Sequence, residues 1–220
     1  MRRMNWKTVS TLVTMVALVG CQETVVAPIA PDSAPTTIRF APEGRPLLSL
    51  SNKNADNNSS DITVGPKGGL FYVGNHAVFF PANSICDPNA VGYTYGAESW
   101  DKSCTLLTSK ITVHAITRTK NGQAAIDFTP SLRFAPSSDP ARWVWLYMYT
   151  PSAKNAMRLT QYNILYTPTL GAVGIDESTD DPTLRTYVDT RTGASLRRIK
   201  HFSGYLSVGY TDTDVDSFRY

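Results

Sequence analysis

The pattern of hydrophobic and polar positions changes near residue 62. Before it, residues 22–61 show little periodicity, because prolines and a run rich in Asn and Ser interrupt the apolar positions. After it, short apolar or alternating runs are separated by turn residues such as Asn121-Gly122. A period of two is typical of strands, and Asn-Gly between two such runs is the strongest short signal for a hairpin. The runs predict strands at residues 70–73, 77–80, 110–117, 124–128, 132–134, 143–149, 163–166, 184–188, 196–199 and 205–208.

No run of ten residues after the first twenty has a convincing helical pattern, and many short strands at this spacing are typical of a β-sandwich. The sequence therefore predicts an all-β protein with an antiparallel β-sandwich at residues 62–210. Residues 21–61 are expected to form a flexible tether rich in Pro, Asn and Ser, in which a short strand at 38–40 docks on the sandwich. Residues 211–220 are expected to form a C-terminal tail.

The strand predicted at 143–149 is apolar on both faces. Trp143, Trp145, Tyr147 and Tyr149 form an aromatic row on one face, and aliphatic side chains occupy the other. Apolar residues on both faces favour a central strand that is buried in the sandwich. The alternative is an exposed row that stacks on the sugar rings of a glycan. Exposed rings in a structure would favour glycan binding, and buried rings would remove it.

Residues 1–20 have the order of a secretory signal peptide: a cationic start, a short apolar run and a small residue before Cys21. The apolar run is about a dozen residues long, whereas a helix that spans a membrane needs roughly 20. Leu18-Val19-Gly20-Cys21 resembles the bacterial lipobox. That resemblance implies cleavage before Cys21 and acylation of this residue. The alternative is an ordinary secreted protein that is cleaved nearby, with Cys21 incidental.

The lipobox resemblance also implies a location. The protein is expected to be extracytoplasmic and lipid-anchored to a bacterial membrane through Cys21, which would be its membrane contact. Gln22, rather than Asp, follows this cysteine, which implies the outer membrane in a cell that has two membranes.

Composition and charge exclude two broad classes. Hydrophobic residues make up 42% of the chain and charged residues 18%, so the chain can bury a core and is not a disordered polyampholyte. The 21 basic and 18 acidic side chains give a formal charge of +3. Arg2, Arg3 and Lys7 account for this excess, so the mature chain is expected to be neutral. A nucleic-acid partner is therefore not expected.

The cysteines support an exported protein. Lipidation of Cys21 would leave Cys86 and Cys104 as a pair in one polar stretch, which predicts a disulfide between them. Such a bond closes a loop of about 19 residues and contributes ~3 kcal/mol in the chain-entropy model. A zinc site is disfavoured, and neither a metal nor another cofactor is expected, because the histidines are scattered singly: His76, His114 and His201.

Two segments resemble a known module. Val64-Gly-Pro-Lys-Gly-Gly-Leu70, followed by Val78-Phe-Phe-Pro81, resembles the opening of a ZU-five domain, which ankyrins, zonula occludens proteins and netrin receptors share. Gly68 can adopt a positive φ where the chain reverses, and Pro81 ends a strand because it has no N–H to donate. The segment 197–205 resembles the closing His-Phe-Ser strand of these domains. The resemblance implies a β-sandwich that binds protein partners.

His201-Phe202-Ser203 carries a specific implication. In some ZU-five relatives the peptide bond between Phe and Ser breaks itself, so the resemblance implies a cut between Phe202 and Ser203. The Ser203 Oγ would attack the Phe202 carbonyl in an N-to-O acyl shift, and His201 would take the proton. This step needs a distorted peptide bond. The alternative is that His201 and Ser203 merely share one face of a strand and that Ser203-Gly204 forms a bend.

The sequence favours a non-catalytic protein. We expect an interaction or structural module of the cell envelope that is not an enzyme and binds an unidentified protein partner. Self-cleavage and glycan binding are the two alternatives. The chain has neither a Gly-x-Ser-x-Gly elbow before a helix nor a Walker loop.

Two charged segments are expected to be solvated. The acidic stretch 176–181 is expected to form a solvated turn, with a calcium loop as the alternative. Arg197, Arg198 and Lys200 are expected on a charged outer face.

Overall fold

A computed structural model describes residues 39–40, 46–47, 59–120, 123–149, 162–169, 172–189 and 192–209. All of these residues belong to the compact unit Pro35–Tyr220. They contain two five-stranded antiparallel sheets, which confirms the predicted all-β sandwich. Cys21, the lipobox and the predicted tail lie outside the described residues. None of the helices in the described part of the chain has the length and hydrophobicity that a membrane crossing requires.

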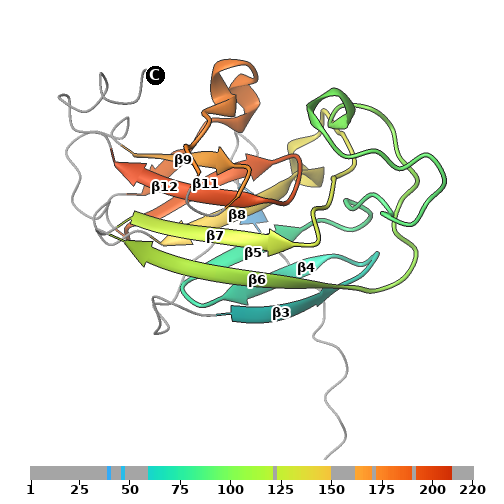
Figure 1. Ribbon diagram of the computed structural model, residues 1–220, viewed down its shortest axis with the longest axis horizontal. Helices are drawn as coiled ribbons and strands as arrows, with labels where there is room; N and C mark the ends of the chain where they lie inside the picture. Colours follow the sequence, from blue (N-terminus) through green and yellow to red (C-terminus); the bar gives the residue numbers. More distant parts are fainter. Residues whose placement is uncertain are drawn as a thin grey trace, which may run out of the picture. The chain divides into compact units, whose positions relative to one another are not determined.

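The first sheet has the order β3-β6-β7-β12-β9. Figure 1 shows β6, β7 and β12 side by side across the front of the view. The register of β6 and β7 runs to Lys120↔Gln123, which leaves two residues for the predicted Asn-Gly hairpin; residues 121–122 themselves are not described. The strands are β3 (Ser59–Val64), β6 (Ile111–Lys120), β7 (Gln123–Thr129), β12 (Gly204–Gly209) and β9 (Tyr162–Thr167).

The second sheet has the order β10-β11-β8-β5-β4. The predicted turn before β4 forms at Gly68, whose φ is +66°. A Cβ atom there would lie 2.1 Å from the carbonyl oxygen of Phe80, so only glycine fits both the conformation and the space. The strands are β10 (Tyr187–Asp189), β11 (Ala194–Ile199), β8 (Val144–Tyr149), β5 (His76–Phe80) and β4 (Gly69–Val73).

The main hydrophobic core draws on both sheets. Period-two alternation in β7 turns Ala124, Ile126 and Phe128 to the buried side. The other sheet supplies aliphatic residues of β8 and the Phe80 ring, and the Phe202 ring from the β11–β12 connection packs against both. Burial of each such side chain stabilises the fold by about 1.5–3 kcal/mol, so this core fixes the position of Phe202.

The middle of the predicted aromatic row is packed rather than exposed. Trp145 and Tyr147 are 0% and 3% exposed, and β8 lies in the middle of its sheet, which confirms the predicted central strand. They form a second cluster with Ala77 and Leu196, separate from the main core. The glycan alternative depends on exposed rings, and the two middle rings do not offer them; Trp143 and Tyr149, at the ends of the row, are partly buried.

Three segments differ from the predicted strands. β3 was not predicted, although it pairs with β6 over its whole length. Residues 132–134 form isolated bridges instead of a strand: Arg133 with His201, and Phe134 with Ile85. Residues 184–188 divide between the 3₁₀ helix η6 (Pro182–Leu184) and β10, because the Asp181 carboxylate caps η6 at the Thr183 N–H.

The predicted tether contains two described strands, β1 (Arg39–Phe40) and β2 (Pro46–Leu47), which pair with each other. β1 overlaps the strand expected at 38–40. β3 begins at Ser59, before the sandwich boundary predicted at residue 62.

Candidate functional site

The His201-Phe202-Ser203 motif lies in the connection between β11 and β12, not inside a regular strand. His201 forms an isolated bridge with Arg133, and the Phe202 N–H donates to the Leu132 carbonyl at 2.6 Å. On the other side of the Phe202–Ser203 peptide bond, the Ser203 carbonyl accepts from the Phe128 N–H at 3.2 Å. Both ends of this peptide unit are therefore fixed by backbone hydrogen bonds.

The Phe202 side chain is a firm anchor. It is fully buried, and its ring stacks on Phe128 with centroids 4.0 Å apart. Phe80 and Phe134 meet the same ring edge to face at 5.5 and 5.0 Å. Because aromatic packing of this kind has a defined geometry, it fixes where the Phe202 carbonyl points.

Gly204 lets β12 begin directly after Ser203. A Cβ atom at Gly204 would lie 2.2 Å from the Thr167 Oγ1 and 2.9 Å from the Thr167 carbonyl oxygen in β9. The close approach of β9 to the chain therefore requires glycine at this position.

His201 is fully buried and is oriented by Glu177. Its Nε2 lies 3.0 Å from Glu177 Oε1, and Glu177 belongs to the 3₁₀ helix η5 (Glu177–Thr179). A carboxylate only accepts hydrogen bonds, so this contact places the ring proton on Nε2 and leaves the Nδ1 lone pair free to act as a base. Burial lowers the pKa of His201, although Glu177 opposes this shift, and the imidazole is therefore neutral at pH 7.

The nucleophile candidate lies next to this lone pair. The Ser203 Oγ is 3.3 Å from His201 Nδ1, which is within the range of a loose serine–base contact. Ser203 is itself buried, at 6% exposed. Ser203, His201 and Glu177 therefore have the order of a nucleophile, a base and a group that orients the base.

A tyrosine hydroxyl contacts the carbonyl that precedes Ser203. The Tyr95 hydroxyl donates to the Phe202 carbonyl oxygen at 2.6 Å and lies 3.3 Å from His201 Nδ1. Burial raises the pKa of Tyr95 to about 12, so the hydroxyl keeps its proton at neutral pH. A protonated donor at this oxygen polarises the carbonyl and would stabilise negative charge on it.

Aromatic rings enclose His201. Trp100 stacks on the imidazole with centroids 3.8 Å apart, and Tyr166 meets it edge to face at 4.8 Å. The Tyr205 hydroxyl donates to the His201 carbonyl at 2.6 Å. These contacts exclude bulk water from the imidazole, and water exclusion strengthens its hydrogen bonds.

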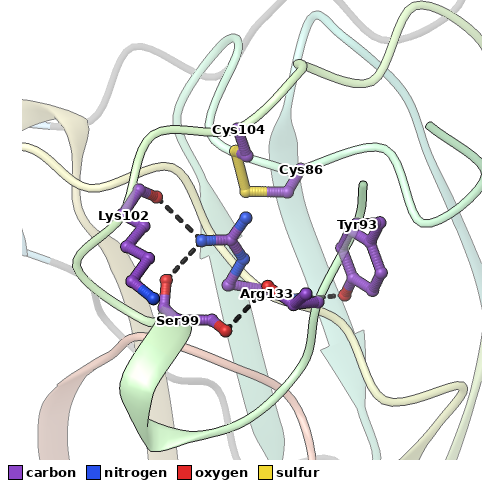
Figure 2. The surroundings of a disulfide bond; sticks show 7 residues. Cys86, Tyr93, Ser99, Lys102, Cys104 and Arg133 are labelled. Carbon is purple, nitrogen blue, oxygen red and sulfur yellow. Dashed lines mark hydrogen bonds between the residues drawn. A yellow bond between two sulfur atoms is a disulfide. The ribbon is translucent and has the colours of Figure 1, made fainter. Parts of the chain in front are cut away.

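The predicted disulfide is present between Cys86 and Cys104, with Cα atoms 5.6 Å apart. It closes the loop that carries Tyr95 and Trp100. Figure 2 shows Arg133 beside this disulfide, with its guanidinium directed at the loop. Its Nη1 donates to the carbonyl oxygens of Ser99 and Lys102, and its backbone N–H donates to the Tyr93 hydroxyl at 3.0 Å.

The acidic stretch 176–181 is not simply a solvated turn. Asp176 and Asp181 cap short 3₁₀ helices, but the Glu177 side chain is only 10% exposed and turns inward. There it pairs with Arg197 at 2.8 Å as well as with His201. Hydrogen bonds to two nitrogen partners offset the cost of burying the carboxylate, which explains the difference from the expected solvated turn.

The expected charged outer face at 197–200 is wrong for both arginines. Arg197 is fully buried, pairs with Glu177 and donates from Nη1 to the Ile164 carbonyl. Arg198 is 7% exposed and lies over the Trp143 ring at 4.1 Å. Adjacent residues of a strand point to opposite faces, and both faces of β11 offer partners for a guanidinium.

The other candidates do not join this site. His76 lies in β5, and His114 is a half-exposed residue of β6 whose Nδ1 contacts the Asp61 carboxylate at 2.6 Å. Among the residues that the structure describes, no group of three or more His, Cys, Asp or Glu side chains has a geometry that holds a metal ion. The sequence pointed to His201 and Ser203 but not to Tyr95 or Trp100, and it placed Glu177 only in an acidic stretch; none of these three lies in a segment with a periodic pattern.

The fold and the site define a β-sandwich with a buried Ser-His-Glu group and a tyrosine on a backbone carbonyl. No protein-family model matches the chain, and no curated protein matches it. The ZU-five resemblance therefore remains a prediction.

Proposed function

We propose that this protein is an exported, lipid-anchored β-sandwich that cleaves its own chain between Phe202 and Ser203. The observation that carries the proposal is the hydrogen bond of 2.6 Å from the Tyr95 hydroxyl to the Phe202 carbonyl oxygen. The residue that follows this carbonyl is Ser203, whose hydroxyl lies beside a neutral, oriented imidazole. The activated carbonyl and the nucleophile thus belong to one peptide unit, so the substrate is the chain itself.

The reaction proceeds in two steps. In the first, the Ser203 Oγ attacks the Phe202 carbonyl carbon, and its proton passes to His201 Nδ1. Tyr95 donates to the oxyanion that forms. The bond from the Phe202 carbon to the Ser203 nitrogen then breaks, and His201 returns the proton to the leaving amine, which gives an ester.

In the second step, water attacks the ester carbonyl, and His201 again accepts the proton. The ester bond breaks and the proton passes to the Ser203 oxygen. The products are a Phe202 carboxylate and a new chain that begins with Ser203 and carries a free amine. One water molecule is consumed, and neither a metal nor another cofactor takes part.

The proposed location is supported by the sequence and by the disulfide. The order of residues 1–21 and the lipobox resemblance support export and acylation of Cys21, and the Cys86–Cys104 disulfide is the kind of bond that persists outside the cytoplasm. Membership of the ZU-five family is part of the same proposal and is supported by the His-Phe-Ser motif.

The second candidate function is a non-catalytic interaction or structural module. It is supported by the closed hydrogen-bond network around His201, which in an uncut chain would act as a rigid lock on the β11–β12 connection. A cavity of about 320 Å³ beside the disulfide, lined in part by Asp87, Tyr93 and Arg133, offers a concave surface for a protein partner.

One mass measurement separates the two candidates. The full chain is expressed with its own signal, extracted from membranes and denatured, and its intact mass is measured with and without a reductant. Self-cleavage predicts two species, one of them the 18 residues from Ser203 to Tyr220. A single uncut species would support the non-catalytic module. The same spectra report acyl chains on Cys21 and the gain of two hydrogen masses when the disulfide is reduced.

Three variants make the assignment specific. Ser203→Ala removes the nucleophile and should give only the uncut species, whereas Ser203→Cys keeps a nucleophile and should still be cut. Ser207→Ala is the matched control, because Ser207 is also a buried serine of the same C-terminal segment. Cleavage of the Ser203→Ala chain at the same bond would contradict the proposed mechanism.

A further inference from the structure

We infer that the Cys86–Cys104 disulfide controls cleavage, because the loop that it closes supplies Tyr95 to the Phe202 carbonyl. This inference rests on the proposed function and adds its regulation. In this inference the loop takes part in the reaction: Tyr95 is a catalytic residue, and the disulfide holds it in position.

Side chains from the loop contact the groups that would react. Tyr95 lies midway between the two cysteines, and its hydroxyl contacts both the carbonyl that would react and the base. Trp100, in the same loop, covers the imidazole of His201. The β11–β12 connection thus supplies the nucleophile and the base, and the loop supplies the oxyanion donor and the ring that covers the base.

The loop is held over the site at several points. Asp101 forms an ion pair with Lys200 at 2.7 Å, and Arg133 donates from beneath to the loop carbonyls of Ser99 and Lys102. At the base of the loop, the Asp87 N–H donates to the Thr105 carbonyl at 2.8 Å. These contacts do not depend on the redox conditions, whereas the disulfide at the same end of the loop does.

Arg133 links the loop to the site in a second way. It is 2% exposed and bridges to His201 through its backbone. No carboxylate among the described residues forms an ion pair with its guanidinium. Its described partners are the two loop carbonyls, which accept hydrogen bonds, and the face of the Tyr93 ring, whose centroid lies 5.8 Å away. A closed loop is therefore needed to satisfy this buried charge, and a loosened loop would disturb Arg133, whose backbone bridges to His201.

The consequence is a chain that stays uncut under reducing conditions. Reduction frees the ends of a loop of about 19 residues, which multiplies the conformations in which Tyr95 is away from the Phe202 carbonyl. Loss of one oxyanion donor typically lowers a rate by ~100–1,000-fold. Because the other contacts still hold the loop part of the time, we expect at least a roughly tenfold slower cut in the reduced chain. The cut would then follow export and oxidation.

The test uses cell-free synthesis of the full chain in dithiothreitol, followed by dilution into buffer with either dithiothreitol or oxidised glutathione. Appearance of the fragment that begins at Ser203 is followed by mass spectrometry. Oxidised wild type should be cut at least about tenfold faster than reduced wild type. A double variant, Cys86→Ser with Cys104→Ser, should be slow in both buffers. Tyr95→Phe, which keeps the ring and the disulfide, should be slow by ~100-fold or more in both.

The outcomes separate this inference from the proposed function. An oxidised wild type that stays uncut contradicts the proposed function itself. Equal rates in both buffers leave self-cleavage standing and overturn control by the disulfide. Thermal unfolding of reduced Ser203→Ala provides the folding check. If this reduced chain has no unfolding transition, slow cleavage reflects global unfolding and the inference is wrong; a retained transition with slow cleavage supports it.

Discussion

The sandwich contains two buried aromatic clusters, and they differ in their polar atoms. One cluster surrounds Trp145 and Tyr147 on the β8 row, and the other surrounds His201 in the β11–β12 connection. In the first, the indole nitrogen of Trp145 has no hydrogen-bond partner among the described residues. In the second, the indole nitrogen of Trp100 likewise has no partner among the described residues, but both imidazole nitrogens and the Ser203 hydroxyl have partners.

This difference distinguishes packing from chemistry. Both clusters are rich in aromatic rings, and the central side chains of both, Trp145 and His201, are fully buried, so neither property identifies a site. The cluster around His201 is organised about one carbonyl, that of Phe202, which receives a hydroxyl donor and has a nucleophile next to it. The polar contacts, rather than the rings, therefore define the candidate site.

The largest expected effect comes from removal of the base. His201→Gln keeps a polar side chain but no proton acceptor of suitable basicity, so the cleavage rate should fall by ~100–10,000-fold. His114→Gln is the matched control, because His114 also contacts a carboxylate but lies half-exposed on β6. Rates are measured in oxidising buffer by mass spectrometry. Equal rates for wild type and His201→Gln would remove the histidine from the mechanism.

The other cluster should respond in stability rather than in rate. Trp145→Ala removes a fully buried indole and should lower the free energy of unfolding by about 3–5 kcal/mol. Urea unfolding in a Ser203→Ala background measures this loss without interference from cleavage. Without urea, where the chain is folded, a Trp145→Ala chain that keeps Ser203 should be cut at the wild-type rate. A large drop in cleavage would mean that the two clusters are coupled.

The pH profile of cleavage should follow His201. Burial lowers the pKa of this group below its usual value of 6.5, so the active neutral form persists at pH 6.5 and above. The rate should be level from about pH 6.5 to 9 and fall tenfold for each further pH unit once the pH passes below the lowered pKa. Tyr95 keeps its proton throughout this range, because its pKa is about 12. A rate that rises on acidification would contradict a neutral base.

The smallest expected effect concerns the ion pairs of Lys200. This side chain pairs with Asp101 and Asp181 at 2.7 and 2.8 Å, and its hydrogen bond, with that of Thr183, lowers the pKa of Asp181 to about 2 although burial raises it. Lys200→Met should cost about 0.2–1 kcal/mol of stability at pH 7, measured by urea unfolding.

The same shift gives the sign of the acid effect. Because the pKa of Asp181 is lower in the folded chain, its contribution is present above pH 3.8 and is lost as the pH falls toward 2. Wild type should therefore lose its advantage over Lys200→Met in this range. An advantage that is as large at pH 2 as at pH 7 would show that Asp181 is not the partner that matters.

The fold was predicted from the sequence because its signals are local. Alternation in β7, Asn-Gly between β6 and β7, and Gly68 before β4 each act over a few residues. β3 was missed because its six residues, Ser59–Val64, include a polar start that continues the composition of the preceding segment. The strand forms because β6 offers it a complete pairing partner, which no local pattern reports.

The site was predicted only in its contiguous part. His201 and Ser203 stand two residues apart and could be found in the sequence, whereas Glu177 and Tyr95 reach them from distant loops. The direction of a loop side chain depends on tertiary partners, so hydropathy does not encode it. Arg197 illustrates the same limit: its charge suggested an outer face, and its burial depends on the Glu177 carboxylate, which comes from another element.

β12 lies between β7 and β9 and pairs with both. A cut before Ser203 leaves every one of these backbone bonds in place, so the fold persists as a complex of two chains. The two chains could then separate on dilution or under a pulling force. In an uncut chain, the covalent bond between Phe202 and Ser203 prevents this separation. Extraction of the short chain would open a gap between two strands with unpaired edges, and such a gap accepts a strand from another molecule.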